Sequence, residues 1–522
     1  AHARAVSDCE LFDPTIWVIA GDGCLQEGVS AEASSLAGHL GLGNLVLIYD
    51  DNSISIDGHT NLSFSEDVSA RYRAYGWDVI EVPMGDDGDV DAVALDRAMT
   101  DAKTKRLRPT LIRMRSTIAW PAPNLRNTAK SHGSALGADE IAATKELLGL
   151  DPEATFQMPD EVLAHARLIK ERGAKAEADW NAAVAIWRAD HADKARAYDE
   201  LFARDLAEAQ FPSFDLGSKL ATRQASGKVL NAVAASLPVL FGGSADLSES
   251  NQTLLEGLGS YLSENRLGRN IHFGIREHAM GAIMNGLALF GFHAYGGTFL
   301  VFAPYMLGAI RLSALMQTPV TYVLTHDSIG LGEDGPTHQP VETIWSLRAL
   351  PDFAVVRPAD ANETAAAWKH LIASGKPAGL VLSRQAIETV VTQEVASKVD
   401  LGAYVLADVE SPEAIIVATG SEVAIALNAA KELNAAGIAT RVVSAPCLEW
   451  FDAQSAEYRE SVLPSSVRNR VSIEAGATQG WYKYVTTPIG LDHFGASAAP
   501  DLLYKEYGIT AEAVVAAVKA QR

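Results

Sequence analysis

The hydrophobic positions of the chain fall into short runs that alternate with Gly-rich turns and Ala-rich segments. The runs are rich in Val, Ile and Leu, which is typical of buried strands, and the Ala-rich segments have the length of helices. The strand-like runs cover residues 16–20, 45–52, 239–247, 270–277, 319–327, 414–422 and 439–446. Strands that alternate with helices in this way predict parallel sheets covered by helices, so the expected fold class is α/β.

These runs group into three blocks joined by two connectors. Residues 160 to about 210 are charged, rich in Ala and almost free of Gly, which predicts helices that bridge two domains. A chain of 522 residues is too long for one hydrophobic core. We therefore predict three consecutive parallel-sheet α/β domains over residues 1–210, 211–388 and 389–522, with the helical linker at the end of the first.

Composition and charge exclude several classes of function. The formal net charge of −22 gives a surface that repels nucleic acid. No apolar run reaches the roughly 18 residues of a membrane span, and the N-terminus lacks the layout of a signal peptide. The three cysteines lie far apart, which fits neither a disulfide framework nor a zinc site. We expect a cytoplasmic protein that binds neither nucleic acid nor membranes.

Polar residues follow the first two strand-like runs. The tripeptide GDG at 21–23 ends the first run, and Asn52 ends the second, thirty positions after Asp22. Adjacent parallel strands would bring these side chains to one edge of a sheet. The Asp22 carboxylate, the Asn52 amide oxygen and the Ile54 carbonyl would form an oxygen set suited to Mg²⁺ or Ca²⁺ beside a diphosphate. The tripeptide alone is more often an ordinary turn, but its spacing from Asn52 favours a metal site.

This spacing resembles the metal–diphosphate motif of thiamine diphosphate enzymes, and further stretches resemble the transketolase family. They are SADLSESN at 244–251, GIREHAMGAIMNG at 274–286, TFLVFAPY at 298–305, HDSIGLGEDGPTHQP at 326–340, SRQ at 383–385 and IEAGATQGWYKY at 473–484. The resemblance runs from about residue 15 to the end of the chain. It implies a diphosphate-binding, a pyrimidine-binding and a C-terminal domain in that order. The implied cofactors are thiamine diphosphate and Mg²⁺, for which Ca²⁺ or Mn²⁺ could substitute.

The resemblance also implies which residues hold the cofactor. They are Asp22, Gly23, Asn52, Ile54, His132, Asp246, Glu277, Phe299, Phe302 and Tyr305, and the first, third and fourth of these bind the metal. Glu277 would bond the aminopyrimidine ring, because a carboxyl group beside an aromatic ring has the raised pKa needed to hold and share a proton. The three aromatic residues would offer the ring a stacking face. Taken alone, such an aromatic stripe is more often core packing.

The residues implied for the substrate are His132, Arg223, Ser250, His326, Asp334, His338 and Arg384. Arginine suits a sugar phosphate because its planar fork donates two parallel hydrogen bonds. The histidines can bond sugar hydroxyls and exchange protons near neutral pH, and Asp334 can orient a hydroxyl. The resemblance gives the catalytic roles to Glu277, His326 and His132.

The implied activity is that of a transketolase, a glycolaldehyde transferase. It moves a two-carbon ketol unit reversibly from a ketose phosphate, such as xylulose 5-phosphate, to an aldose phosphate, such as ribose 5-phosphate or erythrose 4-phosphate, through a carbanion carried by thiamine diphosphate. The family works in the pentose phosphate pathway as a homodimer with its sites between subunits. Deoxyxylulose phosphate synthase shares the DGPTH core but differs around it. Dihydroxyacetone synthase, which uses formaldehyde as acceptor, stays open as an alternative.

Two departures from the family pattern, and the composition of the third block, add expectations. Full-length members carry an upstream stretch with a GHPG-type motif and a Gly-Pro-Leu-Gly loop, and neither occurs here. We therefore expect an N-terminally incomplete first domain and reduced or no activity of this chain alone, whether it is a gene fragment, a shortened form or one part of a split enzyme completed by a separate chain. Ala119 and Trp120 stand where a glycine-containing turn is commoner. The third block has no acid–base cluster, so we expect it to support dimer packing; a regulatory ligand at Gly420–Ser421 is the alternative.

Overall fold

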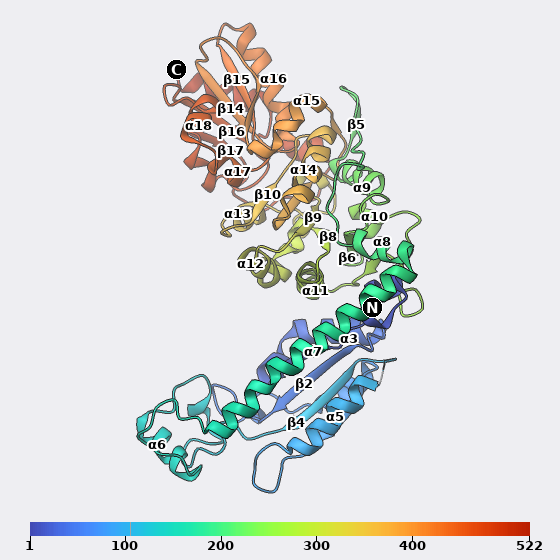
Figure 1. The fold of residues 1–522 in the computed structure, drawn as a ribbon. Helices are drawn as coiled ribbons and strands as arrows, with labels where there is room; N and C mark the ends of the chain where they lie inside the picture. The colour runs from blue at the N-terminus through green and yellow to red at the C-terminus, as the bar shows by residue number, and fades with distance from the viewer. Residues whose placement is uncertain (105) are drawn as a thin grey trace. The chain divides into compact units, whose positions relative to one another are not determined.

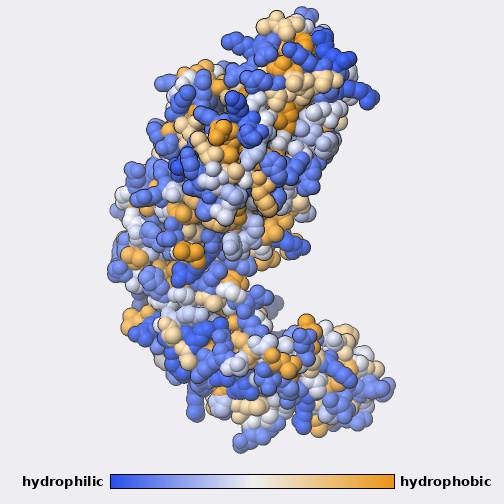
Figure 2. Space-filling view, turned by 180° about the vertical axis from the view of Figure 1, so that it is seen from behind, coloured by the Kyte–Doolittle hydropathy of each residue, from blue (hydrophilic) through white to orange (hydrophobic). Residues whose placement is uncertain are grey.

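Two separate units make up the chain in the computed structural model, which describes residues 1–104 and 106–522 (Figure 1). Unit 1 contains Ala1–Asp199 and Leu262–Leu267, and unit 2 contains Glu200–Tyr261 and Gly268–Arg522. The predicted second and third domains therefore lie together in unit 2. Hydrophilic residues cover most of the face drawn in Figure 2, with hydrophobic residues in separate patches among them.

Unit 1 is built on a parallel sheet with the strand order β1-β2-β4-β3. Its strands are β1 (Ile16–Gly21), β2 (Leu45–Asp51), β3 (Asp78–Val82) and β4 (Thr110–Arg115). Alternate residues of β2 point to opposite faces of the sheet, as the pleat requires. Leu47 and Tyr49 pack against α3 (Gly28–His39) and α4 (Val68–Ala74), whereas Val46 and Ile48 pack against α5 (Ala92–Thr104). The sheet thus carries an apolar cluster on each face.

Strand β1 lies at an edge of this sheet although its sequence reads as an interior strand. Near-continuous apolar runs are typical of strands that are covered on both faces. β1 pairs with β2 on one side, in the register that sets Gly21 opposite Asp50. Ile16, Val18 and Ile19 are exposed by 42%, 40% and 77%. Unit 1 therefore has an apolar sheet edge that faces solvent in this chain.

The remaining elements of unit 1 are helical. They are α1 (His2–Ser7), η1 (Glu10–Phe12), α2 (Asp22–Gln26), η2 (Thr60–Leu62), η3 (Ala129–Ser131), α6 (Ala138–Leu147), α7 (Asp160–Asp190) and α8 (Ala192–Glu200). The charged connector expected to be helical forms α7 and α8. Phe12 fixes the N-terminal segment by packing on Trp187 of α7 and Tyr198 of α8, with ring centroids 4.9 and 4.1 Å away. No helix in the described part of the chain is both long and apolar enough to span a membrane.

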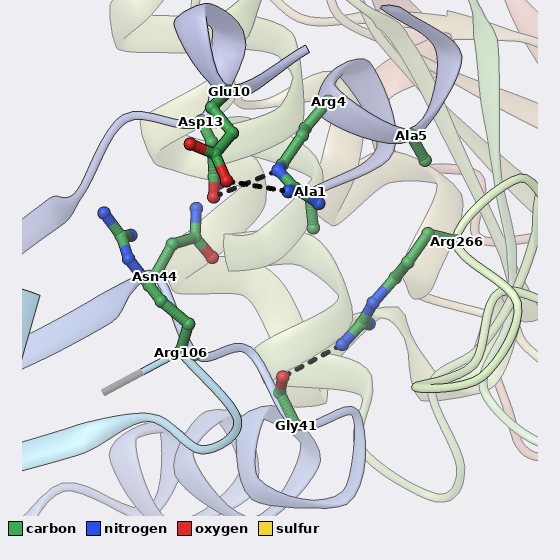
Figure 3. A pocket seen from close by; sticks show the side chains of 10 residues that line it. Ala1, Arg4, Ala5, Glu10, Asp13, Gly41, Asn44, Arg106 and Arg266 are labelled. Carbon is green, nitrogen blue, oxygen red and sulfur yellow. Dashed lines mark hydrogen bonds and ion pairs between the residues drawn. The ribbon is translucent and has the colours of Figure 1, made fainter. Parts of the chain in front are cut away.

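A polar cavity of about 440 Å³ lies between the N-terminal segment and the turn after α3 (Figure 3). Arg4 forms ion pairs with Glu10 and Asp13 on one side of it. On the other side Arg266 donates to the carbonyls of Leu40 and Gly41 at 2.6 and 2.9 Å. These bonds explain why residues 262–267 belong to unit 1.

Unit 2 begins with a parallel sheet of strand order β10-β11-β9-β8-β6-β7. Its strands are β6 (Leu240–Ser244), β7 (Asn270–His272), β8 (His293–Phe299), β9 (Val320–Thr325), β10 (Ala354–Val356) and β11 (Ala378–Leu382). Its helices are α9 (Thr222–Val233), α10 (Ser248–Asn251), α11 (Glu277–Phe290), η4 (Leu300–Met306), α12 (Leu307–Met316), η5 (Ile329–Leu331), α13 (Thr343–Arg348) and α14 (Ala361–Ser374). All residues of β6, β8 and β9 are buried.

The second sheet of unit 2 has the strand order β13-β15-β14-β16-β17, in which β13 alone is antiparallel to its neighbour. It contains β13 (Tyr404–Ala407), β14 (Ala414–Ala418), β15 (Thr440–Ser444), β16 (Asn469–Ile473) and β17 (Thr487–Ile489), with α16 (Glu422–Ala435), α17 (Leu448–Asp452), α18 (Ala456–Val462), η7 (Gln479–Lys483), α19 (Pro500–Glu506) and α20 (Ala511–Ala520). A ribbon of β5 (Lys219–Leu220) and β12 (Ile387–Glu388), followed by α15 (Gln393–Ala396) and η6 (Ser397–Leu401), precedes it. The predicted α/β class with parallel sheets is confirmed.

Candidate functional site

The predicted site residues of unit 2 follow the carboxyl ends of five strands in its first sheet. β6 leads to Asp246 and Ser250, β7 to Glu277, β8 ends at Phe299, β9 leads to His326 and β11 leads to Arg384. Parallel strands place these ends along one edge, which is where open α/β sheets bind ligands. Residues from 246 to 384 are thereby gathered at a single edge.

An aromatic cluster forms the middle of this edge. The Phe299 ring lies 3.7 Å from the His326 ring, measured between centroids, and 5.9 Å from the nearly parallel Phe302 ring. His338 meets Phe302 edge-on at 5.6 Å, and Tyr305 lies 6.2 Å from Phe302. Tyr305 is 71% exposed. The aromatic stripe therefore lines the sheet edge and is not simply core packing, which is the ambiguity that the sequence left open.

Two arginines stand beside this cluster. Arg223 of α9 donates from Nη1 to the Ser250 carbonyl at 2.6 Å, while its buried Nε has no hydrogen-bond partner among the described residues. Burial lowers the pKa of Arg223, and repulsion from Arg384 lowers it further. A bound anion would satisfy the unpaired donor and offset the repulsion between the two cations.

His326 is a neutral imidazole in this setting. Burial lowers its pKa to about 3, and the positive charges of Arg223, Arg384 and His338 contribute to the same shift. A neutral imidazole has one ring nitrogen that can accept a proton. The residue is therefore in the form that a general base needs.

The residues predicted to hold a metal lie together in unit 1. The Tyr49 hydroxyl donates to Asp22 Oδ1 at 2.8 Å, and the backbone N–H groups of Asn52 and Ser53 donate to Asp22 Oδ2 at 3.3 and 3.1 Å. The Ile54 N–H donates to Asn52 Oδ1 at 3.0 Å. Burial raises the pKa of Asp22. A cation would favour the charged carboxylate, so this cluster of oxygen atoms fits a hard divalent ion.

The neighbouring carboxylate of Asp51 is already neutralised. Arg113 Nε and Arg115 Nη1 each lie 2.6 Å from its oxygens. Burial would raise the pKa of Asp51, but these two arginines outweigh it and lower the pKa. A cavity of about 340 Å³ borders this arrangement and is also lined by Asp22 and Ser53. Arg113 and Arg115 line this cavity and could bind the part of a diphosphate's negative charge that the metal does not neutralise.

Within residues 1–104 and 106–522, no group of three or more His, Cys, Asp or Glu side chains is placed to hold a metal. The predicted set contains a single acidic side chain, so this finding does not bear on it. Gly23 follows Asp22 in α2, and its backbone leaves open space where a side chain would stand. His132 is exposed on the loop after η3, and Asp246 and Asp334 are exposed on loops of unit 2. The hydrogen bonds of the described residues do not join His132 to Asp22.

A buried charge network behind the site was missed from the sequence. Asp327, next to His326, pairs with Arg357 Nη2 at 2.8 Å, and Arg357 also pairs with Glu422. Arg357 Nη1 donates to Thr419 Oγ1 at 2.9 Å at the carboxyl end of β14. A Cβ atom on Gly420 would lie 2.6 Å from Arg357 Cζ. The strand end considered for a regulatory ligand thus holds an arginine of the chain itself, and no local motif connects residues so far apart in sequence.

Comparisons with known proteins agree with this arrangement. Family models for the transketolase thiamine diphosphate binding domain, the transketolase pyrimidine binding domain and the transketolase-like C-terminal domain match residues 1–207, 218–389 and 402–510. The transketolase of Mycobacterium tuberculosis (strain H37Rv) is 48% identical over 534 residues, covering 97% of this chain and 76% of the relative. That of Geobacillus stearothermophilus is 48% identical over 524 residues, covering 98% and 78%. The transketolase structure from Leishmania mexicana matches with a TM-score of 0.93 at 42% identity, covering 99% of this chain and 78% of that one.

The matched domains define an α/β enzyme of the class that binds thiamine diphosphate. The chain belongs to the transketolase family. The predicted family and its glycolaldehyde transferase activity are confirmed. The expectation of a shortened chain gains no support from these matches, which take in nearly all of the sequence. The domain boundaries and the roles of single residues stay predictions.

Proposed function

We propose that this transketolase binds its ketose phosphate donor along the edge of the six-stranded sheet, with the phosphate on Arg223 and Arg384. The observation that carries this proposal is the buried Nε of Arg223, which has no hydrogen-bond partner in residues 1–104 and 106–522 and lies beside a second arginine and the neutral His326. An anion at this point would restore the missing hydrogen bond in an otherwise acidic protein. Ser250, whose carbonyl holds Arg223, would complete the phosphate end.

Each of the two units holds groups that suit one part of the cofactor. Asp22, Asn52 and Ile54 would hold Mg²⁺ and through it the diphosphate, and Phe299, Phe302 and Tyr305 would stack on the pyrimidine. Glu277 would bond a pyrimidine nitrogen, and Gly23, His132 and Asp246 would complete the pocket. Thiamine diphosphate supplies the nucleophile and the electron sink of the reaction when bound.

The protein's own groups then orient the sugar and move its protons. His326 would accept the proton of a donor hydroxyl, because it is neutral and lies on the Phe299 ring. Asp334 and His338 would bond hydroxyls further along the sugar, and His132 would bond those nearest the reacting carbons. Xylulose 5-phosphate is the expected donor, with ribose 5-phosphate or erythrose 4-phosphate as acceptor in the pentose phosphate pathway. A related Pichia stipitis structure, with a TM-score of 0.91 and 42% identity, is a complex with sedoheptulose 7-phosphate.

The setting of the enzyme is part of the proposal. A cytoplasmic homodimer with Mg²⁺ follows from the family resemblance, and the acidic surface is consistent with a protein that avoids nucleic acid. The exposed apolar edge of β1 supports the addition of a further strand from elsewhere in the protein or from a separate chain. Such a strand would cover Ile16, Val18 and Ile19.

A kinetic comparison tests the phosphate site. Arg384→Ala should raise the KM for xylulose 5-phosphate roughly 10- to 100-fold, as expected for a lost charged hydrogen bond of about 1.5–3 kcal/mol. The KM for an unphosphorylated ketose such as erythrulose should stay the same. Arg468→Ala is the control, since this exposed arginine precedes the amino end of β16. Equal effects of Arg384→Ala on both ketoses would contradict the assignment, and a preference for formaldehyde as acceptor would favour dihydroxyacetone synthase.

A further inference from the structure

A chain of hydrogen bonds runs from the backbone of β8 to the His326 ring. Ser244 Oγ donates to the Gly297 carbonyl at 2.8 Å, and Asn251 Nδ2 donates to Ser244 Oγ at 2.9 Å. Thr325 Oγ1 donates to Asn251 Oδ1 at 2.7 Å and lies 2.9 Å from His326 Nδ1. Ser244, Asn251 and Thr325 are fully buried, so water does not compete for these bonds.

The direction of this chain follows from its first member. A carbonyl oxygen only accepts, so the single proton of the Ser244 hydroxyl is committed to Gly297. Ser244 Oγ must then accept from the Asn251 amide, which turns Asn251 Oδ1 toward Thr325. The Thr325 hydroxyl donates its only proton to that oxygen, so toward the imidazole it can act only as an acceptor. His326 Nδ1 therefore carries a hydrogen, and in the neutral ring Nε2 keeps its lone pair.

The backbone of β8 is shaped for this arrangement. Register places Ser244 of β6 beside Gly297 and Phe299 of β8 beside Thr325 of β9. A Cβ atom on Gly297 would lie 2.9 Å from Asn251 Nδ2 and 2.8 Å from Thr253 Cγ2. A side chain at this position would displace the amide, so the glycine is required by the close approach of Asn251.

We propose that Asn251 and Thr325 are positioning residues that hold His326 in the Nδ1–H tautomer, so that Nε2 is the atom that takes up the donor's hydroxyl proton. The inference rests on the proposed function for the identity of the proton donor. In the step, the O–H bond breaks with its electron pair left on oxygen, and the Nε2 lone pair forms the new N–H bond. The resulting imidazolium still donates from Nδ1 to Thr325, so the chain needs no rearrangement.

Nitrogen NMR tests the tautomer independently of activity. The full chain would be labelled with ¹⁵N in its 13 histidine rings, with the His326 signals assigned by their loss in His326→Gln. Native protein and Thr325→Ser, which keeps the hydroxyl, should show a protonated Nδ1 and an unprotonated Nε2. Thr325→Val has the same shape without the hydroxyl and should shift the ring toward the Nε2–H form. A native His326 protonated at Nε2, or a Thr325→Val spectrum equal to the native one, would overturn the proposal.

Kinetics of the holoenzyme with cofactor and Mg²⁺ provide the second measurement. Thr325→Val should lower kcat about 10- to 100-fold, part of the contribution of a general base, with little change in KM for the ketose. Thr325→Ser should keep kcat within about threefold of native. Equal losses in both variants, or a loss confined to KM, would contradict a tautomer effect. If the native chain is inactive but shows the Nδ1–H spectrum, the proposed function is contradicted and the positioning role is supported.

If Thr325→Val does not fold, Asn251 offers a second pair of variants. Asn251→Asp keeps an acceptor facing Thr325 and should preserve the Nδ1–H spectrum, because a carboxylate does not donate. Asn251→Ala removes the acceptor, which frees the Thr325 proton to turn toward His326. A spectrum that is the same in both variants would refute the role of Asn251.

Discussion

Single residues at the sheet edge show how far burial changes ordinary chemistry. Free histidine titrates near neutral pH, but His326 is held neutral by burial among Arg223, Arg384 and His338. The same burial raises the pKa of Asp22 in unit 1, where a cation would favour the ionised form. Burial thus prepares the neutral form of His326 that the proposed chemistry uses. For Asp22 it opposes the ionised form, which a bound cation would favour.

A strained residue in unit 1 gives a prediction at this scale. Ala119 has a φ of 57°, in the left-handed region that costs a residue with a Cβ atom about 1 kcal/mol. Ala119→Gly should therefore raise the free energy of unfolding of unit 1 by up to about 1 kcal/mol, measured by urea denaturation. Ala129→Gly in the helical turn η3 is the control and should lower it; a loss of stability in Ala119→Gly would show that the strain is not released.

The sequence predicts that two residues lie close together only where each follows a predicted strand. Asp22 and Asn52 were placed together because each follows a strand and the two strands are neighbours. Ser244, Asn251 and Thr325 could not be connected in this way, because their bonds depend on which strands pair and on the direction of each donor. The partner of Asp327 was likewise not predicted, because Arg357 follows β10, a strand that no predicted run covers.

At the scale of elements, every predicted apolar run contains a strand, but other strands, among them β3, β4 and β8, were not predicted. β14 and β15 fall at the expected residues. β8 was not expected, because Gly296 and Gly297 interrupt its pattern. These glycines admit Met284 and Asn251, whose atoms would lie 2.5 and 2.9 Å from an added Cβ. β8 therefore contains two residues of low β propensity at the point where the hydrogen-bond chain reaches its backbone.

Helix α14 carries a buried carboxyl group that makes stability depend on pH. Burial raises the pKa of Glu363 to about 7, with the nearby Asp360 acting in the same direction. Tyr404 and Ser444 of the second sheet donate to its Oε1 at 2.5 and 2.6 Å, and the Ala359 N–H donates to Oε2 at 2.7 Å. Glu363 therefore joins the helix to the second sheet in a form that keeps its proton at mildly acid pH.

The sign of this dependence follows from the proton balance. Between pH 4.5, the ordinary pKa of the group, and about 7, the folded state holds a proton that the unfolded state has lost. Stability therefore falls as the pH rises through this window. Glu363→Gln should flatten this fall, measured as urea midpoints at pH 5, 6 and 7. With the amide oxygen facing Tyr404 and Ser444, the amide nitrogen takes the place of Oε2 and cannot accept from the Ala359 N–H, so stability at pH 5 should be lower. If stability falls with pH as steeply in Glu363→Gln as in the native protein, Glu363 is not the cause of the fall.

At the scale of the whole molecule, the second and third predicted domains lie in one unit and share one core. Residues of both sheets in unit 2, among them Val356, Leu380, Ile416 and Val471, belong to a single apolar cluster. The sequence predicted the boundary between residues 388 and 389, but the extent of packing across it depends on tertiary contacts. The apolar β1 run was expected as a strand, and its position at an edge was not.

The buried network across the two sheets gives a prediction for unit 2. Arg357 is fully buried between Asp327 and Glu422. Arg357→Met would leave two buried carboxyl groups without their cation and should cost about 3–5 kcal/mol of stability, measured by thermal unfolding. Adding Asp327→Asn and Glu422→Gln to Arg357→Met should restore part of the loss, because the remaining groups are neutral. No recovery in the triple variant would mean that packing of the arginine, and not its charge, supports the structure.

The same arginine bears on how members of this family could be recombined. Residues 402–510 match a family model of their own, which invites exchange of this region between enzymes as a ready module. Its central strand β14 is nevertheless followed by Thr419 and Gly420, which contact the guanidinium of Arg357, a residue outside the matched region. In a chimera joined near residue 400, Thr419 and Gly420 would come from one parent and the arginine that they contact from the other. Compatible exchange therefore requires the host to carry arginine at the position of Arg357, or the graft to begin upstream of it.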